Sequence, residues 1–235
     1  MNRTHGTQVP ATITTRGESS LKNLTNQLRG IIFDMDGTII DTERLWEEAI
    51  ITVLKNNGAI ASEERYHQEL DKTAGRHLYD TTNLLLEAFK LLVTPAQFQK
   101  ELVITTKGLM SKDINFIHGF EEFHRRVTDA KIPTSIATNC EIESLQVLIE
   151  KMRFIDFFGD QIFCIDYVEN KAKPDPALFL HAAAQLKADP AECIVFEDSL
   201  AGFQAAKAAQ ISCIGINNKK NTSFIKDYTV GTIDT

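Results

Sequence analysis

Short apolar runs alternate with helix-spaced segments along most of this chain, and that alternation predicts its architecture. Ile31, Ile32 and Phe33 form the first run, which is typical of a strand buried on both faces of a sheet. Strands that alternate with helices indicate an α/β fold, with a parallel sheet doubly wound by helices on both faces. Further strands are predicted at 133–139, 161–165, 193–196 and 211–216, and helices at 121–130, 142–152, 176–186 and 199–209.

Between the first two strands the pattern predicts helices alone. Apolar residues recur at helical spacing over 46–54, and the apolar stretch 84–93 is too long for an ordinary strand. Thr94 and Pro95 are typical of a helix N-cap and of the first residue inside a helix. We therefore expect an all-helical insertion over residues 42–111.

The first 28 residues differ in composition from the rest. They are rich in Thr, Ser, Asn and Gln, Glu18 is their only acid, and they contain no apolar stretch typical of a secretory signal. We expect a disordered tail here. The sequence thus predicts three parts, namely the tail (1–28), a core domain (29–41 and 112–235) and the helical insertion (42–111).

The charge balance limits the possible partners. The net charge is −7, the pI is near 5.4, and no cluster of Lys and Arg stands out, which argues against nucleic acid or an anionic membrane surface. No apolar run is long enough for a transmembrane helix. The cysteines lack a CxxC spacing, so we expect buried free thiols in a reducing compartment, and hence a cytoplasmic protein. We take a monomer as the default oligomeric state.

Polar side chains follow the predicted strands. Asp34 and Asp36 come after the first strand, and they leave it on the same side because side chains in an extended chain alternate with a period of two. Ligands of doubly wound sheets bind beyond the carboxyl ends of the strands, so we expect the polar strand ends to form one site. The other candidates are Thr138 and Asn139, Lys173 in the loop after the third strand, and Glu197 and Asp198.

These residue types suit phosphoryl transfer. Oxygen ligands favour Mg²⁺, and a bound cation would keep Asp34 ionised as a nucleophile that forms an aspartyl phosphate. Asp36 can protonate the leaving oxygen and later deprotonate the attacking water. The Thr138 hydroxyl can hold a phosphoryl oxygen, and Lys173 supplies a fixed positive charge.

Taken singly, each of these residues also has an ordinary explanation. Lys173 alone could be a surface lysine, and Thr138 could cap the end of a strand. Glu197 and Asp198 could simply favour the start of the next helix through its dipole. Their shared placement at strand ends, in this chain order, favours an active site.

Four segments resemble the signature motifs of the haloacid dehalogenase-like hydrolase superfamily. The resemblance runs from about Gly30 to Ile216, and the segments around Asp41 and Gly202 resemble the β-phosphoglucomutase/phosphatase-like subgroup. It implies a Rossmann-like core with an all-helical cap inserted after the first motif, where the helical insertion is predicted. The motifs are Asp34-Met35-Asp36-Gly37-Thr38, Thr138-Asn139, Lys173-Pro174-Asp175-Pro176 and Phe196-Glu197-Asp198-Ser199.

The resemblance also implies roles for these residues. Asp34 would be the nucleophile and Asp36 the acid/base. Mg²⁺ would be held by Asp34, the Asp36 carbonyl and Asp198, with Glu197 assisting through the outer shell of the metal. Dehalogenases lack the second aspartate, so Asp36 places this chain among the phosphotransfer members.

Candidate substrate contacts are Asn139, Arg76 and Trp46. Mutase members resemble one another in a histidine in the first cap helix, where this chain has Trp46. Their phosphate-binding arginine comes three residues after a glycine, whereas Arg76 follows Gly75 directly. Both departures weaken the mutase interpretation, and Trp46 also fits an aromatic residue on the buried face of a helix.

The leading hypothesis is a Mg²⁺-dependent phosphatase for a small phosphate ester, either a sugar phosphate or a nucleoside monophosphate. A phosphomutase is the alternative within the enzyme class. A phosphoacceptor signalling module or an inactive binding module are alternatives of another class. Receiver domains lack a helical insertion and carry the acceptor aspartate on a later strand, and the complete set of motifs disfavours an inactive binder.

Overall fold

A seven-stranded sheet carries the predicted polar strand ends. The computed structural model describes residues 13–15, 28–73, 78–110, 114–218, 221 and 225–234. The strands lie in the order β1-β7-β6-β5-β2-β3-β4, and every neighbouring pair is parallel except β1 with β7. The predicted doubly wound α/β fold is confirmed. The strands are β1 (Ile13–Thr15), β2 (Gly30–Phe33), β3 (Thr134–Thr138), β4 (Ile162–Cys164), β5 (Cys193–Glu197), β6 (Ser212–Asn217) and β7 (Gly231–Asp234).

Two layers of helices cover the two faces of the sheet, because alternate strand residues face opposite sides. Ile31 and Phe33 pack with residues of α6, α7 and α8, whereas Ile32 packs with residues of α9, α10 and α11. Among the described residues, none of the helices combines the length and the apolarity needed to cross a membrane. The core helices are α6 (Phe120–Asp129), α7 (Ile142–Met152), α8 (Phe154–Phe158), α9 (Ala177–Gln185), α10 (Leu200–Ala208) and α11 (Ile225–Tyr228), with 3₁₀ turns η1 (Ile165–Val168) and η2 (Pro190–Glu192).

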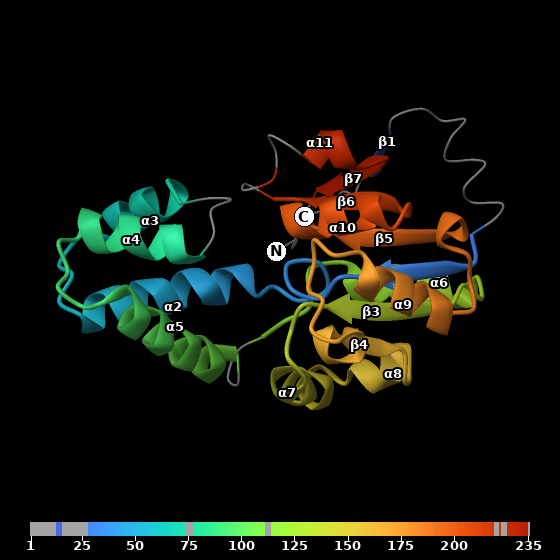
Figure 1. The fold of residues 1–235 in the computed structure, drawn as a ribbon, viewed down its shortest axis with the longest axis horizontal. Coiled ribbons are helices and arrows are strands. Elements are labelled where there is room, and N and C mark those ends of the chain that lie inside the picture. The colour runs from blue at the N-terminus through green and yellow to red at the C-terminus, as the bar shows by residue number, and fades with distance from the viewer. Residues whose placement is uncertain are drawn as a thin grey trace, which may run out of the picture.

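Between β2 and β3, four of the five described helices form a second lobe beside the sheet (Figure 1), while the last, α6, packs in the core. This cap has its own apolar cluster, in which Val53, Leu85 and Leu102 are buried. The cluster explains why these amphipathic segments fold as helices, since each one buries its apolar face against the others. The predicted all-helical cap is confirmed. Its helices are α2 (Glu43–Asn56), α3 (Glu63–Asp71), α4 (Leu78–Ala88) and α5 (Pro95–Met110).

The helix predicted over 84–93 begins and ends earlier than the apolar stretch suggests. Lys90 has a φ of 53°, in the left-handed region, and the amide of Leu91 bonds to the carbonyl of Leu86 at 2.9 Å. This pattern closes a helix at its C-terminus, so α4 ends at Ala88. The apolar residues beyond it belong to the loop that leads to α5.

Two strands lie outside the predicted pattern. Ile13–Thr15, inside the segment expected to be a disordered tail, form β1 and pair antiparallel with β7. Isoleucine and threonine favour extended structure, and β1 pairs with the outer side of β7, which would otherwise be the edge of the sheet. The remaining tail residues up to 27, together with Arg76, lie outside the described residues.

The four cysteines are free thiols, as their spacing predicts. Cys164, Cys193 and Cys213 are buried in the core, and Cys140 is half-buried next to the end of β3. Burial raises the pKa of the Cys193 thiol to about 11, so this residue behaves as a core side chain.

Candidate active site

Asp34 and Asp36 lie in a tight turn after β2. The amide of Asp34 bonds to a carbonyl of β5, which fixes the start of the turn, and three later amides converge on the carbonyl of Met35. Gly37 has a φ of +75°, and a Cβ at this position would lie 2.3 Å from Oδ2 of Asp198. Only glycine fits here, because the turn needs both the left-handed backbone and the close approach.

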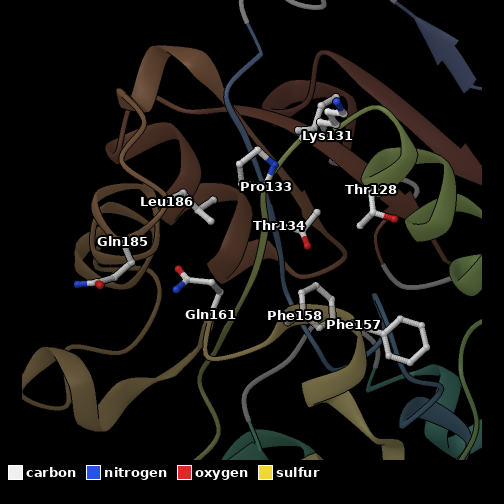
Figure 2. A pocket seen from close by; sticks show the side chains of 10 residues that line it. Thr128, Lys131, Pro133, Thr134, Phe157, Phe158, Gln161, Gln185 and Leu186 are labelled. Atoms are coloured by element: carbon white, nitrogen blue, oxygen red, sulfur yellow. The ribbon is translucent and has the colours of Figure 1, made fainter.

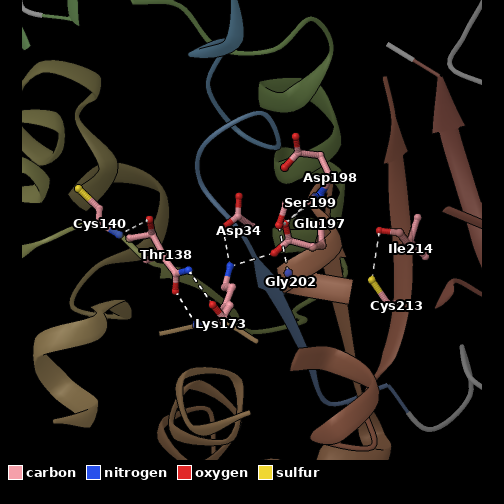
Figure 3. A network of polar contacts seen from close by, with 11 residues as sticks. Asp34, Thr138, Cys140, Lys173, Glu197, Asp198, Ser199, Gly202, Cys213 and Ile214 are labelled. Carbon is pink, nitrogen blue, oxygen red and sulfur yellow. Dashed lines mark hydrogen bonds and ion pairs between the residues drawn. The ribbon is translucent and has the colours of Figure 1, made fainter. Parts of the chain in front are cut away.

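Lys173 joins the carboxylates of two strands. Its Nζ lies 2.5 Å from Asp34 Oδ1 and 2.9 Å from Glu197 Oε2 (Figure 3), and the Phe179 ring centroid lies 4.6 Å away. Burial alone would lower the pKa of Lys173, but Asp34 and Glu197 outweigh it and raise the pKa above its usual value. Lys173 therefore remains a cation.

The pKa of Asp34 is raised to about 8, mainly because burial removes water from the carboxylate. Glu197 adds to this rise, and Lys173 opposes it. Acceptor oxygens of Asp34, Glu197 and Asp198 also lie within 4.8 Å of one another. A cluster of oxygen ligands with more negative than positive charge fits a hard divalent cation such as Mg²⁺.

Both oxygens of Glu197 are bound by protein groups. Oε2 accepts from Lys173, while Oε1 accepts from the amide of Asp198 at 3.1 Å and from the amide and hydroxyl of Ser199 at 2.9 and 2.8 Å. A Cβ on Gly202 would lie 1.9 Å from the glutamate Cδ, so the glycine makes room for this side chain. These contacts favour an indirect role for Glu197, as the resemblance implies.

Asp36 sits between the core and the cap. Burial raises the pKa of Asp36, while hydrogen bonds from the Thr42 and Thr138 hydroxyls counteract part of this rise. A carboxyl group with a raised pKa retains its proton closer to neutral pH, which suits a general acid. Thr42 is the N-cap residue of α2, so its contact connects Asp36 to the first cap helix.

The predicted substrate contacts have different surroundings. Asn139 Oδ1 accepts from the amide of Lys173 at 2.9 Å, and its Nδ2 donates to the carbonyl of Lys173 at 3.4 Å. Asn139 therefore holds the loop that carries the lysine. Trp46 is half-buried against the apolar cluster of the cap, and Arg76 lies outside the described residues. Substrate contact by these three residues stays a prediction.

Three residues that contact the site are not among the predicted site residues. Thr42 and Gly202 lie in the two segments that resemble the subgroup, but neither residue type by itself indicates a role at the site. Asn218, which donates to Asp198 Oδ2 at 3.1 Å, lies just beyond β6, where no motif marks it. A survey of every polar residue after a predicted strand would have included Asn218.

A cavity of about 400 Å³ has none of the site carboxylates in its wall, and Figure 2 shows the residues that line it. Its wall includes Pro133 and Gln161, which precede β3 and β4, and Leu186 at the end of α9. These residues mark the amino ends of the strands, whereas Asp34 and Asp198 follow the carboxyl ends. The cavity is therefore separate from the candidate active site.

Comparisons with known proteins agree with the fold. Residues 31–216 match the haloacid dehalogenase-like hydrolase family. A phosphorylated carbohydrates phosphatase from Thermotoga maritima is 30% identical over 192 residues, which cover 80% of this chain and 84% of the relative. The solved structure of a T. maritima protein provisionally named β-phosphoglucomutase has a TM-score of 0.70 and 27% identity, over 88% of this chain and 94% of that one. A family hydrolase from Deinococcus radiodurans has a TM-score of 0.74 at 22% identity, over 89% and 91% of the two chains, which supports the fold alone.

Proposed function

The chain belongs to the haloacid dehalogenase-like hydrolase family, and from this premise we propose that it is a Mg²⁺-dependent phosphatase for small phosphorylated metabolites. The family predicted from the four motifs is confirmed, as is the enzyme class, phosphoric monoester hydrolase. The observation that carries the proposal is the buried arrangement of Asp34, Lys173 and Glu197 beside Asp198. It combines a nucleophile, a fixed cation and oxygen ligands for a metal.

In the first step Asp34 attacks the phosphorus atom of the substrate. The bond between phosphorus and the leaving oxygen breaks, and that oxygen takes the proton of Asp36, whose raised pKa favours the protonated form. The Lys173 cation stabilises the charge on the phosphoryl oxygens, and the Thr138 hydroxyl, whose single proton no longer needs to point at a protonated Asp36, can donate to one of these oxygens. Mg²⁺ held by Asp34, the Asp36 carbonyl and Asp198 would supply the positive charge that keeps Asp34 ionised.

In the second step a water molecule attacks the phosphoryl group on Asp34. Asp36, now a carboxylate, takes a proton from that water, the bond between phosphorus and Asp34 breaks, and inorganic phosphate leaves. The step restores the Asp34 carboxylate and the protonated Asp36. The Thr42 hydroxyl holds Asp36 beside the start of the first cap helix.

A sugar phosphate is the substrate class that the similarities favour, and a nucleoside monophosphate is the alternative. The relative that is 30% identical is named for phosphorylated carbohydrates. The 27% similarity to a protein provisionally named β-phosphoglucomutase keeps a phosphomutase as the second candidate function. A mutase returns the phosphoryl group to the sugar instead of passing it to water.

The test is phosphate release from a panel of sugar phosphates and nucleoside monophosphates by the wild type and by Asp34→Asn. We expect release that needs Mg²⁺, stops with a chelator and is lost in the variant, because an amide cannot act as the nucleophile. Asp129→Asn is the matched control, since it removes one carboxylate from an exposed ion pair with Arg125 on α6. Full activity of Asp34→Asn would refute the nucleophile.

A hexose 1-phosphate with a bisphosphate activator separates the two candidates. A phosphatase releases phosphate in proportion to the sugar consumed. Isomerised sugar phosphate without matching free phosphate would establish the mutase instead.

A further inference from the structure

An asparagine side chain beyond β6 lies against the carboxylate of Asp198. Strand β6 pairs in parallel with β5, and Gly215 lies opposite Glu197, so the carboxyl ends of the two strands are neighbours. Asp198 follows β5 and Asn218 follows β6. Asn218 Nδ2 donates to Asp198 Oδ2 at 3.1 Å. The contact joins two loops that are 20 residues apart in the chain.

A second asparagine holds Asn218 in place. The backbone N–H of Asn218 donates to Asn221 Oδ1, and the backbone N–H of Asn221 donates to Asn218 Oδ1, both at 3.0 Å. Asn221 Nδ2 donates to the carbonyls of Asp198 and Ile216, at 2.7 and 2.8 Å. Asn221 is only 1% exposed, so a buried and satisfied amide ties the end of β6 to the backbone of Asp198.

These hydrogen bonds allow only one orientation of the side-chain amide of Asn218. Its Oδ1 accepts from the backbone of Asn221, so its Nδ2 must face Asp198. The reverse orientation would set two donors against each other at Asn221 and two acceptors against each other at the carboxylate. Asn218 therefore presents a fixed donor to one oxygen of Asp198 and restricts the rotation of that carboxylate.

We propose that Asn218 is a positioning residue that orients Asp198 for the divalent cation, an inference that rests on the metal site of the proposed function. A hydrogen bond to one oxygen of a ligand carboxylate selects the rotamer in which the group meets the metal. A neutral amide does this without a positive charge that would repel the cation. Asn221 has a different task, because its side-chain donors bind backbone carbonyls.

The test is the binding of Mn²⁺ alone to the metal-free full-length protein, measured by electron paramagnetic resonance. Two variants remove the donor, namely Asn218→Ala and Asn218→Leu, the second of which keeps most of the side-chain volume. We expect Mn²⁺ affinity at least about ten-fold weaker in both. Both variants also leave the backbone N–H of Asn221 without its acceptor, so we expect the melting temperature of the metal-free protein to fall by about 2–12 °C. Mn²⁺ affinity is therefore measured well below both melting temperatures, where a merely structural role would leave it at the wild-type value.

Asn57→Ala is the matched control. Asn57 Nδ2 donates to Glu101 Oε2 at 2.7 Å, which is the same type of contact placed within the cap. We expect wild-type Mn²⁺ affinity in this variant. If Asn218→Ala does not fold, Asn218→Leu carries the test.

Wild-type Mn²⁺ affinity in the Asn218 variants would overturn the inference. Mn²⁺ binding that weakens only at temperatures at which the variants unfold would also overturn it, because the residue would then act through stability alone. A wild-type protein that binds no Mn²⁺, or binds it unchanged after Asp198→Asn, would instead refute the metal site of the proposed function. The two failures are therefore distinguishable.

Discussion

Gly202→Ala should displace the buried side chain of Glu197 by steric overlap. A Cβ at this position would lie 1.9 Å from both Cδ and Oε2 of Glu197, far inside contact distance. The glutamate would have to leave, and would lose Lys173 and the donors from Asp198 and Ser199. Lys173 would keep Asp34 as its partner, so the cost is the loss of the hydrogen bonds to the glutamate carboxylate. A bond to a charged group contributes about 1.5–3 kcal/mol, so losing several of them costs about 3–5 kcal/mol once the displaced carboxylate regains some bonds to water.

A loss of this size should be visible in thermal unfolding followed by circular dichroism. For a chain of this length, 1 kcal/mol corresponds to about 2–4 °C, so the melting temperature should fall by about 6–20 °C. Gly108→Ala is the matched control, because Gly108 lies in α5 and a Cβ there meets nothing within 4 Å. The control should stabilise the protein by up to about 1 kcal/mol, since alanine favours a helix over glycine.

The same substitution in a Glu197→Ala background separates the clash from other effects. With the glutamate side chain removed, the three atoms nearest to the added Cβ are gone, so Gly202→Ala should be neutral or stabilising by up to about 1 kcal/mol. The predicted sign of the effect is thus reversed between the two backgrounds. An equal cost in both backgrounds, or a wild-type melting temperature for Gly202→Ala alone, would refute the reasoning.

Two further predictions follow from groups with shifted pKa values. Burial lowers the pKa of His124, whose ring lies 3.0 Å from the Thr134 hydroxyl, so the folded state disfavours the imidazolium. Its contribution to stability is present above the unfolded pKa of about 6.5 and is lost as the pH falls through the folded pKa. Urea unfolding at several pH values should therefore show less acid destabilisation in His124→Gln than in the wild type; an unchanged pH dependence would contradict this. Thr42→Val removes a hydrogen bond that lowers the pKa of Asp36, so the basic limb of the pH profile of kcat/KM should move to higher pH, while Thr42→Ser should leave it in place. A basic limb that does not move in Thr42→Val would exclude the contact as an influence on the general acid.

The core of the fold and the members of the site could be predicted because each depends on local sequence. Apolar runs such as 31–33 and 193–196 predict buried strands. Parallel strands then bring the residues that follow them to one end of the sheet. Asp34 and Glu197 were predicted to meet for this reason. Their contact through Lys173 follows from the same topology, since the loop after β4 ends beside both strands.

The remaining features depend on contacts that no local pattern records. Helix α3 buries only Tyr66 and Leu70, which is too few apolar positions for a clear signal. Strand β7 has only four residues, and it is held in the sheet by pairing with β6. The contact of Asn218 with Asp198 depends on how two loops approach each other in space. Such pairs are fixed by tertiary packing, so they could not be read from the sequence of either loop.

The central claim is that Asp34 carries the phosphoryl group during turnover. Rapid acid quenching of the enzyme with a sugar phosphate and Mg²⁺, followed by borohydride, would reduce an aspartyl phosphate to homoserine, which peptide mass spectrometry can locate. We expect homoserine at position 34 only when substrate and Mg²⁺ are both present. An unmodified Asp34 in every quenched sample during turnover, or homoserine at another position, would contradict the proposed mechanism.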